Sequence, residues 1–268
     1  MLLDLRAAAE EALEEIVRLE SILSFFQPTS EITNINDHAA REPVTVSPEL
    51  LTLLLRCRSL HAETGGVFDI TVALLMRCWR FMNDTGAVPT EEAIAAALAC
   101  TGMQHVRLDE ENCTVSLAKE GVMLDLGSIG KGYALEQAAE LLVENEFEHF
   151  LIHGGTSTVY AHGTQADGTP WRIAVDHPDE GEPPLQIIDL ESESLSVSGI
   201  DGKSFVDDEG TEQGHVIDPR TGRPTQAARV AAVICESATE SDAWATALLV
   251  DPTLTPPSHI RVCDQIDS

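Results

Sequence analysis

Basic residues are scarce in this chain. Its 268 residues include 16 Lys and Arg against 45 Asp and Glu, which gives a formal net charge of −29 at pH 7. The lysines are limited to Lys119, Lys131 and Lys203. Clustered Lys and Arg hold nucleic acids and anionic membrane surfaces, so this charge argues against both as partners. A hydrophobic content of 43% still allows a buried core, which argues against intrinsic disorder.

Long hydrophobic runs and paired cysteines are also absent. No stretch reaches 18 apolar residues, and the N-terminus is acidic with helical spacing, whereas a secretory leader is basic and then apolar. We therefore expect a soluble chain with no transmembrane segment and no leader of its own. The six cysteines form no Cys-x-x-Cys pair, which excludes the usual patterns of zinc sites and disulfide scaffolds. We expect these thiols to be reduced and mostly buried.

The spacing of apolar residues predicts an α+β or mixed α/β fold. Helices are expected over 3–23, 48–64, 90–100, about 132–146, and from near Ser237. Short strands are expected within 113–118, 122–127, 149–154, 171–175, 185–190, 194–198 and 229–235. The elements do not alternate regularly, which argues against a doubly wound sheet. The length suits one large domain or two small ones.

The segment DLGSIGKG (125–132) lies between a predicted strand and a predicted helix. Its glycines let the backbone approach a ligand, and the helix N-terminus offers N–H groups to a phosphate. The spacing fits neither a Walker A loop nor the dinucleotide-binding G-x-G-x-x-G pattern. A glycine-rich turn without a ligand is the alternative interpretation.

Asp242 and Thr246 form a second candidate site. Ser237 and Glu240 match a capping box, so a helix is expected to begin there. The i,i+4 spacing then places the Asp242 carboxylate and the Thr246 hydroxyl on one helix face, where the oxygens suit Mg²⁺. The first turn of a helix also favours the ionised carboxylate. The alternative is an ordinary solvated face.

His215 opens a third candidate segment, HVIDPRTGRP (215–224). Asp-Pro-x-Thr-Gly is typical of a turn, and His215 is expected at the end of the strand that enters it. A histidine in that place is suited to accept a proton near neutral pH. We interpret the other histidines, such as His61 and His149, as surface or packing residues.

Seven ordered segments resemble the ApbE family, the FAD:protein FMN transferases. They cover most of the chain from about residue 10 to 250, and we expect one ApbE-like domain over 1–268. The segments are LSFFQPTSEITNIN (23–36), GGVFDITVALLMRCW (65–79), VMLDLGSIGKGYALEQAAELL (122–142), FLIHGGTSTVYAHG (150–163), SLSVSG (194–199), HVIDPRTGRPT (215–225) and SDAWATALLV (241–250).

The resemblance implies an enzyme that uses FAD as its substrate. In the family, FAD lies in a cleft with Mg²⁺ at its pyrophosphate, and FMN is moved to a Thr or Ser hydroxyl of an acceptor protein with release of AMP. The resemblance implies Asp242, Thr246 and an oxygen of Ser128 as metal ligands. It implies FAD contacts at Val67, Phe68, Asp69, Asp125, Lys131 and Ile217. His215 would lie beside the reacting phosphate, and either His215 or a carboxylate such as Asp242 would be the base.

The sequence also leaves two other interpretations open. One is a FAD pyrophosphatase that produces free FMN and AMP with water as the acceptor. The other is an inactive FAD-binding or incomplete member of the family.

The chain also departs from the family pattern at both ends. The implied fold is α+β, an ApbE-like (T-fold-like) mixed sheet with packed helices. The family's first strand has no counterpart here, and the tail after Val250 is short and interrupted by prolines, so we expect the usual C-terminal strands to be missing and an open sheet edge in their place. Many relatives are periplasmic or membrane-anchored through a segment that would precede this first strand.

Overall fold

The computed structural model describes residues 2–83, 86–179, 181–200 and 204–267, which divide into two compact units. Residues 1–20, 127–199 and 228–268 form the first, here called the sheet unit. Residues 21–126 and 200–227 form the second, here called the helical unit. Within the described residues, no helix is both long enough and apolar enough to span a bilayer.

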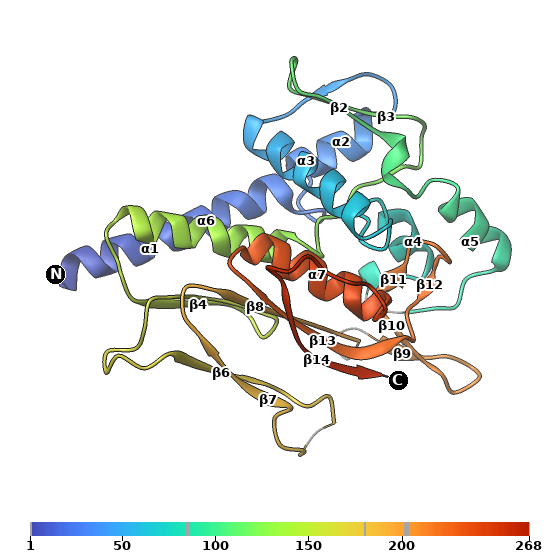
Figure 1. Ribbon diagram of the computed structural model, residues 1–268. Helices are drawn as coiled ribbons and strands as arrows, with labels where there is room; N and C mark the ends of the chain where they lie inside the picture. The colour runs from blue at the N-terminus through green and yellow to red at the C-terminus, as the bar shows by residue number, and fades with distance from the viewer. Residues whose placement is uncertain (1, 84–85, 180, 201–203, 268) are drawn as a thin grey trace. The chain divides into compact units, whose positions relative to one another are not determined.

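A five-stranded antiparallel sheet is the centre of the sheet unit, with the strand order β14-β13-β8-β5-β4. The register places Val233 of β13 opposite Ser196 of β8 and Val262 of β14. Helices α6 and α7 lie over one face of this sheet, and the β6–β7 hairpin lies on the other side (Figure 1). The bounds are α1 (Leu2–Leu23), β4 (Phe150–Gly154), β5 (Thr158–His162), β6 (Trp171–Val175), β7 (Gln186–Leu190), β8 (Ser194–Gly199), β13 (Ala228–Cys235), β14 (Arg261–Asp267), α6 (Gly130–Glu144) and α7 (Ala238–Val250).

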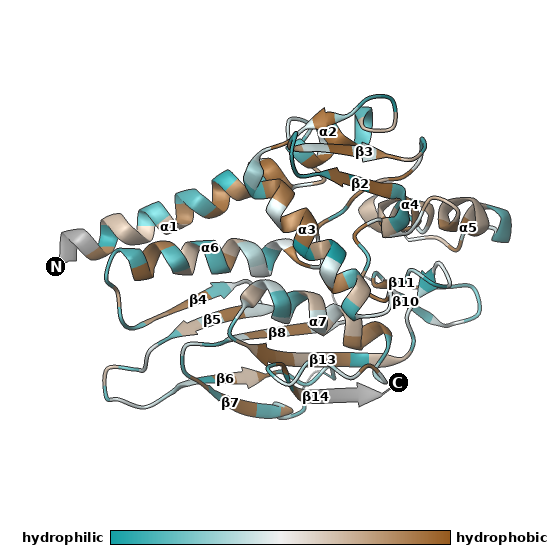
Figure 2. Cartoon of the chain, turned by 45° about the horizontal axis from the view of Figure 1, so that its top comes forward, coloured by the Kyte–Doolittle hydropathy of each residue, from teal (hydrophilic) through white to brown (hydrophobic). Residues whose placement is uncertain are grey.

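Hydrophobic side chains cover both faces of this sheet. Strand β13 is hydrophobic over most of its length (Figure 2), and its Ala232 and Ile234 pack with Val175 of β6 and Leu190 of β7. A second cluster joins α1 to α6 through Ala8, Ala12, Ala138 and Leu142. Two-sided burial explains why β13 reads as an almost continuous apolar run.

The tail after Val250 forms a strand, which corrects our expectation that the usual closing strands are missing here. β14 pairs antiparallel with β13 and covers the edge that we expected to be open. The prolines at 252, 256 and 257 all precede Arg261, so they interrupt the connection and leave the strand intact. Although we expected a mixed sheet, all pairings between described strands are antiparallel, and one isolated Val72–Met123 bridge is parallel.

Small helices and short strands make up the helical unit. A three-stranded sheet has the order β1-β3-β2, and two hairpins follow from residue 204 onward. Leu75, Trp79, Phe81, Ile94 and Ile217 share one core. The bounds are α2 (Glu31–His38), β1 (Val44–Thr45), α3 (Pro48–Glu63), α4 (Ala73–Cys78), α5 (Glu91–Leu98), β2 (Val106–Asp109), β3 (Thr114–Leu117), β9 (Ser204–Val206), β10 (Glu212–Gly214), β11 (Ile217–Asp218) and β12 (Arg223–Pro224), with 3₁₀ turns at Phe81–Asn83 and Met103–His105.

The predicted helix starts are confirmed by their caps. Ser47, Thr90 and Ser237 each accept a hydrogen bond from the backbone N–H three residues on. The strand expected over 122–127 is wrong. The side-chain amide of Asn36 bonds both the N–H and the C=O of Leu124, at 2.7 and 2.9 Å, and thereby replaces the partners that a neighbouring strand would supply.

All six cysteines are free, as expected. Cys57 and Cys235 are buried, whereas the other four are half-buried, so the expectation of mostly buried thiols holds for two of the six. Burial raises the pKa of the Cys235 thiol to about 12, which makes it a poor nucleophile.

Candidate functional site

Asp242 of α7 is the most deeply buried of the predicted site residues that carry a charge. It is 4% exposed, and its Oδ2 accepts a hydrogen bond of 2.9 Å from the backbone N–H of Gly132 in the first turn of α6. A Cβ at Gly132 would lie 2.1 Å from the Ala238 carbonyl oxygen. The glycine therefore lets α6 approach α7 closely enough for this bond to form.

The protonation of Asp242 reflects two opposing influences. Burial raises the pKa of its carboxyl, and the Lys131 ammonium and the Gly132 N–H partly offset this effect. We expected Asp242 to lie in the first turn of α7, where the helix dipole favours the ionised form. This is wrong, because α7 begins at Ala238 and the acidic residue in its first turn is Glu240, so Asp242 lies beyond that turn and burial is the larger influence. A buried carboxylate in this state is stabilised by a cation placed beside it.

The Thr246 hydroxyl lies one turn further along α7. Its Oγ1 donates to the carbonyl of Asp242 at 3.2 Å, and the Ser198 hydroxyl of β8 lies 3.3 Å away. This arrangement leaves a lone pair on Thr246 for a further ligand. Ser128 is half-buried in the turn before α6. Among the residues that the structure describes, there is no group of three His, Cys, Asp or Glu side chains that could hold a metal ion alone.

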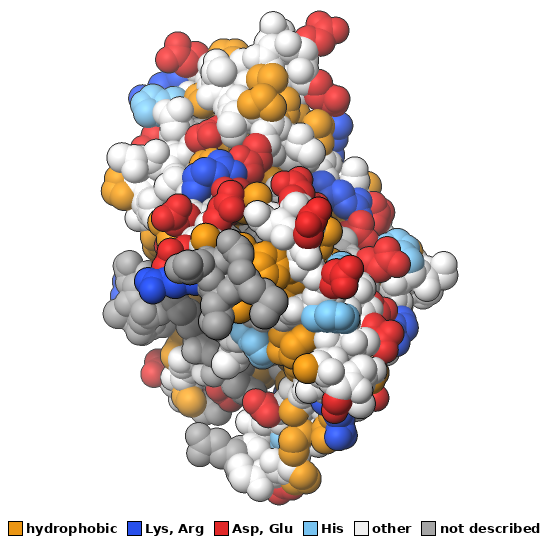
Figure 3. Space-filling view, turned by 90° about the vertical axis from the view of Figure 1, so that its left-hand side faces the viewer, with side chains coloured by type: hydrophobic (Ala, Val, Ile, Leu, Met, Phe, Trp, Pro, Cys, Tyr) orange, Lys and Arg blue, Asp and Glu red, His pale blue; other side chains and the backbone are white. Residues whose placement is uncertain are grey.

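Lys131 gives this part of the sheet unit its positive charge. The side chain is exposed, and its Nζ contacts the Ser157 hydroxyl. Helix α6 has no side-chain N-cap and no acidic residue of its own in the first turn, and the Asp242 carboxylate, which bonds the Gly132 N–H, offsets part of the positive charge at this N-terminus. Figure 3 shows Asp and Glu side chains spread over one face of the molecule, with Lys and Arg isolated among them. Local positive charge is therefore needed wherever an anion binds.

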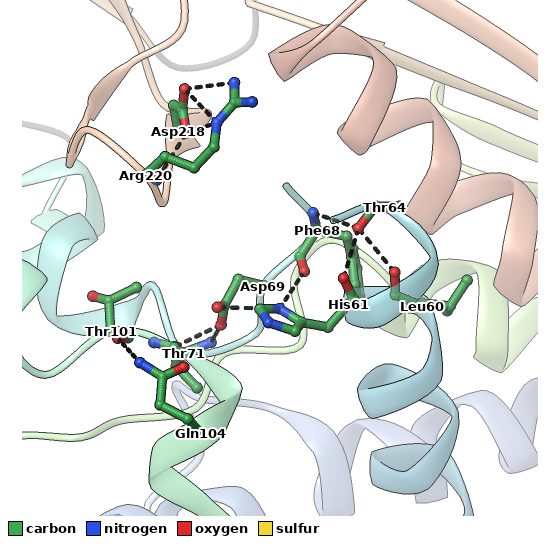
Figure 4. A network of polar contacts seen from close by, with 11 residues as sticks. Leu60, His61, Thr64, Phe68, Asp69, Thr71, Thr101, Gln104, Asp218 and Arg220 are labelled. Atoms are coloured by element: carbon green, nitrogen blue, oxygen red, sulfur yellow. Dashed lines mark hydrogen bonds and ion pairs between the residues drawn. The ribbon is translucent and has the colours of Figure 1, made fainter. Parts of the chain in front are cut away.

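The segment 64–71 carries three predicted FAD contacts in the helical unit, and Figure 4 shows that it is held by its own hydrogen bonds. The Phe68 N–H donates to Thr64 Oγ1 at 3.0 Å. Asp69 Oδ1 accepts from the Thr71 N–H at 2.7 Å and from its hydroxyl at 2.5 Å. The side chains of Val67, Phe68 and Asp69 are all buried.

His61 is also part of this network. Its Nδ1 lies 3.0 Å from the Phe68 carbonyl oxygen and 3.3 Å from Asp69 Oδ2. Burial raises the pKa of the Asp69 carboxyl, against the opposing effects of the Thr71 hydrogen bonds and of His61. These contacts are compatible with the packing role that we expected for His61, and they add hydrogen-bond partners that the sequence did not indicate.

A short hairpin follows His215. His215 is half-buried in a bend between β10 and β11, and Ile217 is buried in the core. Asp218 accepts from the Arg220 backbone N–H at 2.8 Å and from its guanidinium at 2.9 Å. Gly222, at a φ of +70°, closes the turn, and its carbonyl accepts from Trp79 Nε1 at 2.8 Å. The predicted turn is confirmed.

The structure distributes the predicted site residues over both units. Ser128, Lys131, Asp242 and Thr246 belong to the sheet unit, and the others belong to the helical unit. Their roles stay predictions. Sequence reasoning missed Ser198 and His61, because neither lies in a motif whose spacing indicates its partner. The predicted site residues that belong to the helical unit are Val67, Phe68, Asp69, Asp125, His215 and Ile217.

Comparisons with known proteins support the resemblance described above. The FAD:protein FMN transferase of Klebsiella pneumoniae (strain 342) is 33% identical over 252 residues, which covers 92% of this chain and 71% of the relative. The enzyme of that name from Escherichia coli (strain K12) is 31% identical over 237 residues, with coverages of 86% and 67%.

Solved structures show the same fold. The crystal structure of the ApbE protein from Thermotoga maritima has a TM-score of 0.86 and 34% identity, and the match covers 91% of this chain and 79% of that one. The Pseudomonas stutzeri flavinyl transferase ApbE, in its apo form, has a TM-score of 0.81 and 29% identity, with coverages of 91% and 76%. The model of the ApbE family matches residues 2–259, and this chain therefore belongs to that family.

Proposed function

We propose that this protein is an enzyme that transfers FMN from FAD to a Thr or Ser hydroxyl of an acceptor protein, with Mg²⁺ required and AMP released. Membership in the ApbE family and two relatives named FAD:protein FMN transferase support flavin transfer. The observation that carries the finer proposal is the buried Asp242 carboxylate, which bonds the first turn of α6 and lies one turn from the Thr246 hydroxyl on α7.

Few protein oxygen atoms lie around Asp242. They suit Mg²⁺, which is coordinated partly by phosphate and water, better than they suit a cation coordinated by protein atoms alone. Mg²⁺ takes one or two carboxylates and shares its remaining positions with phosphate oxygens and water. One buried carboxylate and the Thr246 hydroxyl, with an oxygen of Ser128, match that preference. When bound, Mg²⁺ would neutralise the pyrophosphate and stabilise charge on the leaving AMP.

The chain's own residues would bind the substrate and move one proton. Lys131 and the N-terminus of α6 would attract the pyrophosphate against the overall negative charge. The acceptor hydroxyl would attack the phosphorus of the FMN half, and the bond from that phosphorus to the bridging oxygen would break as AMP leaves. We assign the hydroxyl proton to His215, because Asp242 already accepts from Gly132 and would face the metal.

A mass measurement tests this proposal. Purified protein is incubated with FAD, Mg²⁺ and an acceptor that one of the compared transferases flavinylates, and we expect the acceptor to gain the mass of FMN less one water, with one AMP per adduct. An acceptor whose target Thr is replaced by Val is the control. Free FMN with AMP and no adduct would instead indicate hydrolysis. FAD that stays bound while no AMP appears would indicate an inactive protein.

Removal of the metal is expected to weaken FAD binding. With excess chelator, the FAD dissociation constant should rise roughly tenfold or more, since the metal supplies several kcal/mol of charge stabilisation at phosphate oxygens. Quenching of flavin fluorescence during titration measures the constant, and added Mg²⁺ should restore it. Equal binding with and without chelator would contradict the assignment of Asp242 and Thr246 as ligands.

A further inference from the structure

We propose that His61 is a positioning residue for the FAD-binding segment 64–71, and that its Nδ1–H holds the Phe68 carbonyl and the Asp69 carboxylate in the binding conformation. This inference rests on the proposed function, which assigns FAD contacts to Val67, Phe68 and Asp69. It adds a residue outside those contacts, on α3, and a chemical reason for their geometry.

The tautomer of His61 follows from its neighbours. Nδ1 lies 3.0 Å from the Phe68 carbonyl oxygen and 3.3 Å from Asp69 Oδ2. A carbonyl oxygen can only accept, so the contact with Phe68 assigns the hydrogen to Nδ1, and the Asp69 carboxylate lies close enough to accept from the same N–H. Figure 4 shows the imidazole pointing from α3 toward both groups.

Asp69 needs a donor on this side because its carboxylate is enclosed. The Asp69 side chain is 2% exposed, whereas the His61 side chain is 23% exposed. Oδ1 is bonded twice by Thr71, and Oδ2 lies within reach of His61. The Met103 backbone also contributes a hydrogen bond to this carboxylate, so loss of the Nδ1–H would leave Asp69 with fewer donors and would favour a different conformation of the segment.

The hydrogen bonds continue from His61 in both directions. Toward α3, Thr64 Oγ1 donates to the Leu60 carbonyl at 2.8 Å and accepts from the Phe68 N–H. Toward the other end, the Thr71 hydroxyl oxygen accepts from the Gly102 N–H at 2.5 Å. The hydrogen bonds of the Asp69 carboxylate therefore hold the segment in one conformation. Any flavin contact made by residues 64–71 depends on this preorganised backbone.

The imidazole also packs over Gly66. A Cβ at Gly66 would lie 3.5 Å from His61 Cε1 and 3.7 Å from Nε2, and Gly66 has a φ of +87°. The Gly66 N–H donates to the His61 carbonyl at 2.7 Å. The His61 carbonyl thus accepts a hydrogen bond in the turn that leads into the segment, and the His61 imidazole packs against the same turn.

Three substitutions distinguish the roles of the two ring nitrogens of His61. His61→Asn places an amide N–H near the position of Nδ1, His61→Gln places one near Nε2, and His61→Ala removes both. We expect His61→Ala and His61→Gln to raise the FAD dissociation constant and the KM for FAD roughly tenfold or more. His61→Asn should restore both to within about threefold, and kcat should change little in all three variants. His38→Ala, at an exposed histidine of α2, is the control.

Hydrogen exchange gives a readout that does not depend on FAD. Amides of residues 64–71 should exchange faster in His61→Ala than in wild type and more slowly again in His61→Asn. Rescue by Gln but not Asn, or wild-type FAD binding in all three variants, would overturn the proposal. If wild type bound no FAD, the proposed function would fail, while the exchange rates would still decide whether Nδ1 holds the segment.

Discussion

Asp242→Asn is expected to abolish flavin transfer while it makes the metal-free protein more stable. The amide keeps an oxygen that can accept from the Gly132 N–H, so the contact between α6 and α7 is retained. The negative charge is lost, and with it the principal proposed ligand for Mg²⁺. We expect the rate of transfer to fall at least a hundredfold, since metal assistance is worth several kcal/mol and each 1.4 kcal/mol is about a factor of ten.

The gain in stability follows from the direction of the pKa shift. Burial raises the pKa of the Asp242 carboxyl, so the folded protein binds the proton more tightly than the unfolded chain does. The free energy of unfolding therefore decreases as pH rises from the ordinary carboxyl pKa through the raised one. Above that range, Asp242→Asn should be more stable than wild type by about 1.4 kcal/mol for each unit by which burial raises the pKa of the carboxyl.

Chemical denaturation at several pH values measures this difference. Other carboxyls contribute to the pH dependence, including Asp69, whose pKa burial also raises, but they are common to both proteins and cancel in the comparison. Asp242→Ala is the matched control, because it removes the acceptor for the Gly132 N–H and should destabilise the protein at all pH values. A variant that is less stable at neutral pH and still transfers flavin would refute the account of this carboxylate.

Gly132→Ala is expected to cause the largest loss of stability. Alanine normally improves a helix position by about 1 kcal/mol relative to glycine. Here its Cβ would lie 2.1 Å from the Ala238 carbonyl oxygen and 2.8 Å from Asp242 Cβ. Backbone cannot move aside as a side chain can, so α6 and α7 would have to separate. We expect a net destabilisation of roughly 3 kcal/mol or more, measured as a lower denaturation midpoint.

Gly199→Ala provides the comparison for the steric argument. Gly199 lies in the same unit and also has no positive φ, but an added Cβ would be 3.4 Å from the Arg229 carbonyl oxygen, an ordinary contact. We expect a change of less than about 1 kcal/mol at this position. Similar losses in both variants would show that glycine itself, and not the approach of α6 to α7, determines the effect.

Sequence patterns predicted those elements whose local signals agree with their environment. Ser47, Thr90 and Ser237 precede apolar helical spacing, and each caps a helix. The apolar run 122–127 has the pattern of a short strand. Its Leu124 backbone is instead hydrogen-bonded by the side chain of Asn36, which is far away in the sequence. No periodicity within six residues reveals such a partner.

The candidate site divides in a similar way. Family motifs pointed to Asp242 and Thr246, and the helix places them one turn apart as predicted. His61 could not be found in this way, because its role depends on how the chain folds back after Gly66 to bring Phe68 and Asp69 to its ring. Gly132 was part of a recognised motif. The reason why a glycine is needed there, the close approach of the Ala238 carbonyl, is visible only in three dimensions.

The order of strands in the sheet also has a consequence for synthesis on the ribosome. β13 lies between β8 and β14, although the segment 200–227 separates it from β8 in the chain and belongs to the other unit. As the chain emerges, β4, β5 and β8 can pair while the far edge of β8 has no partner. An unpaired edge attracts other strands, so nascent chains stalled before Ala228 should be the form most prone to aggregate.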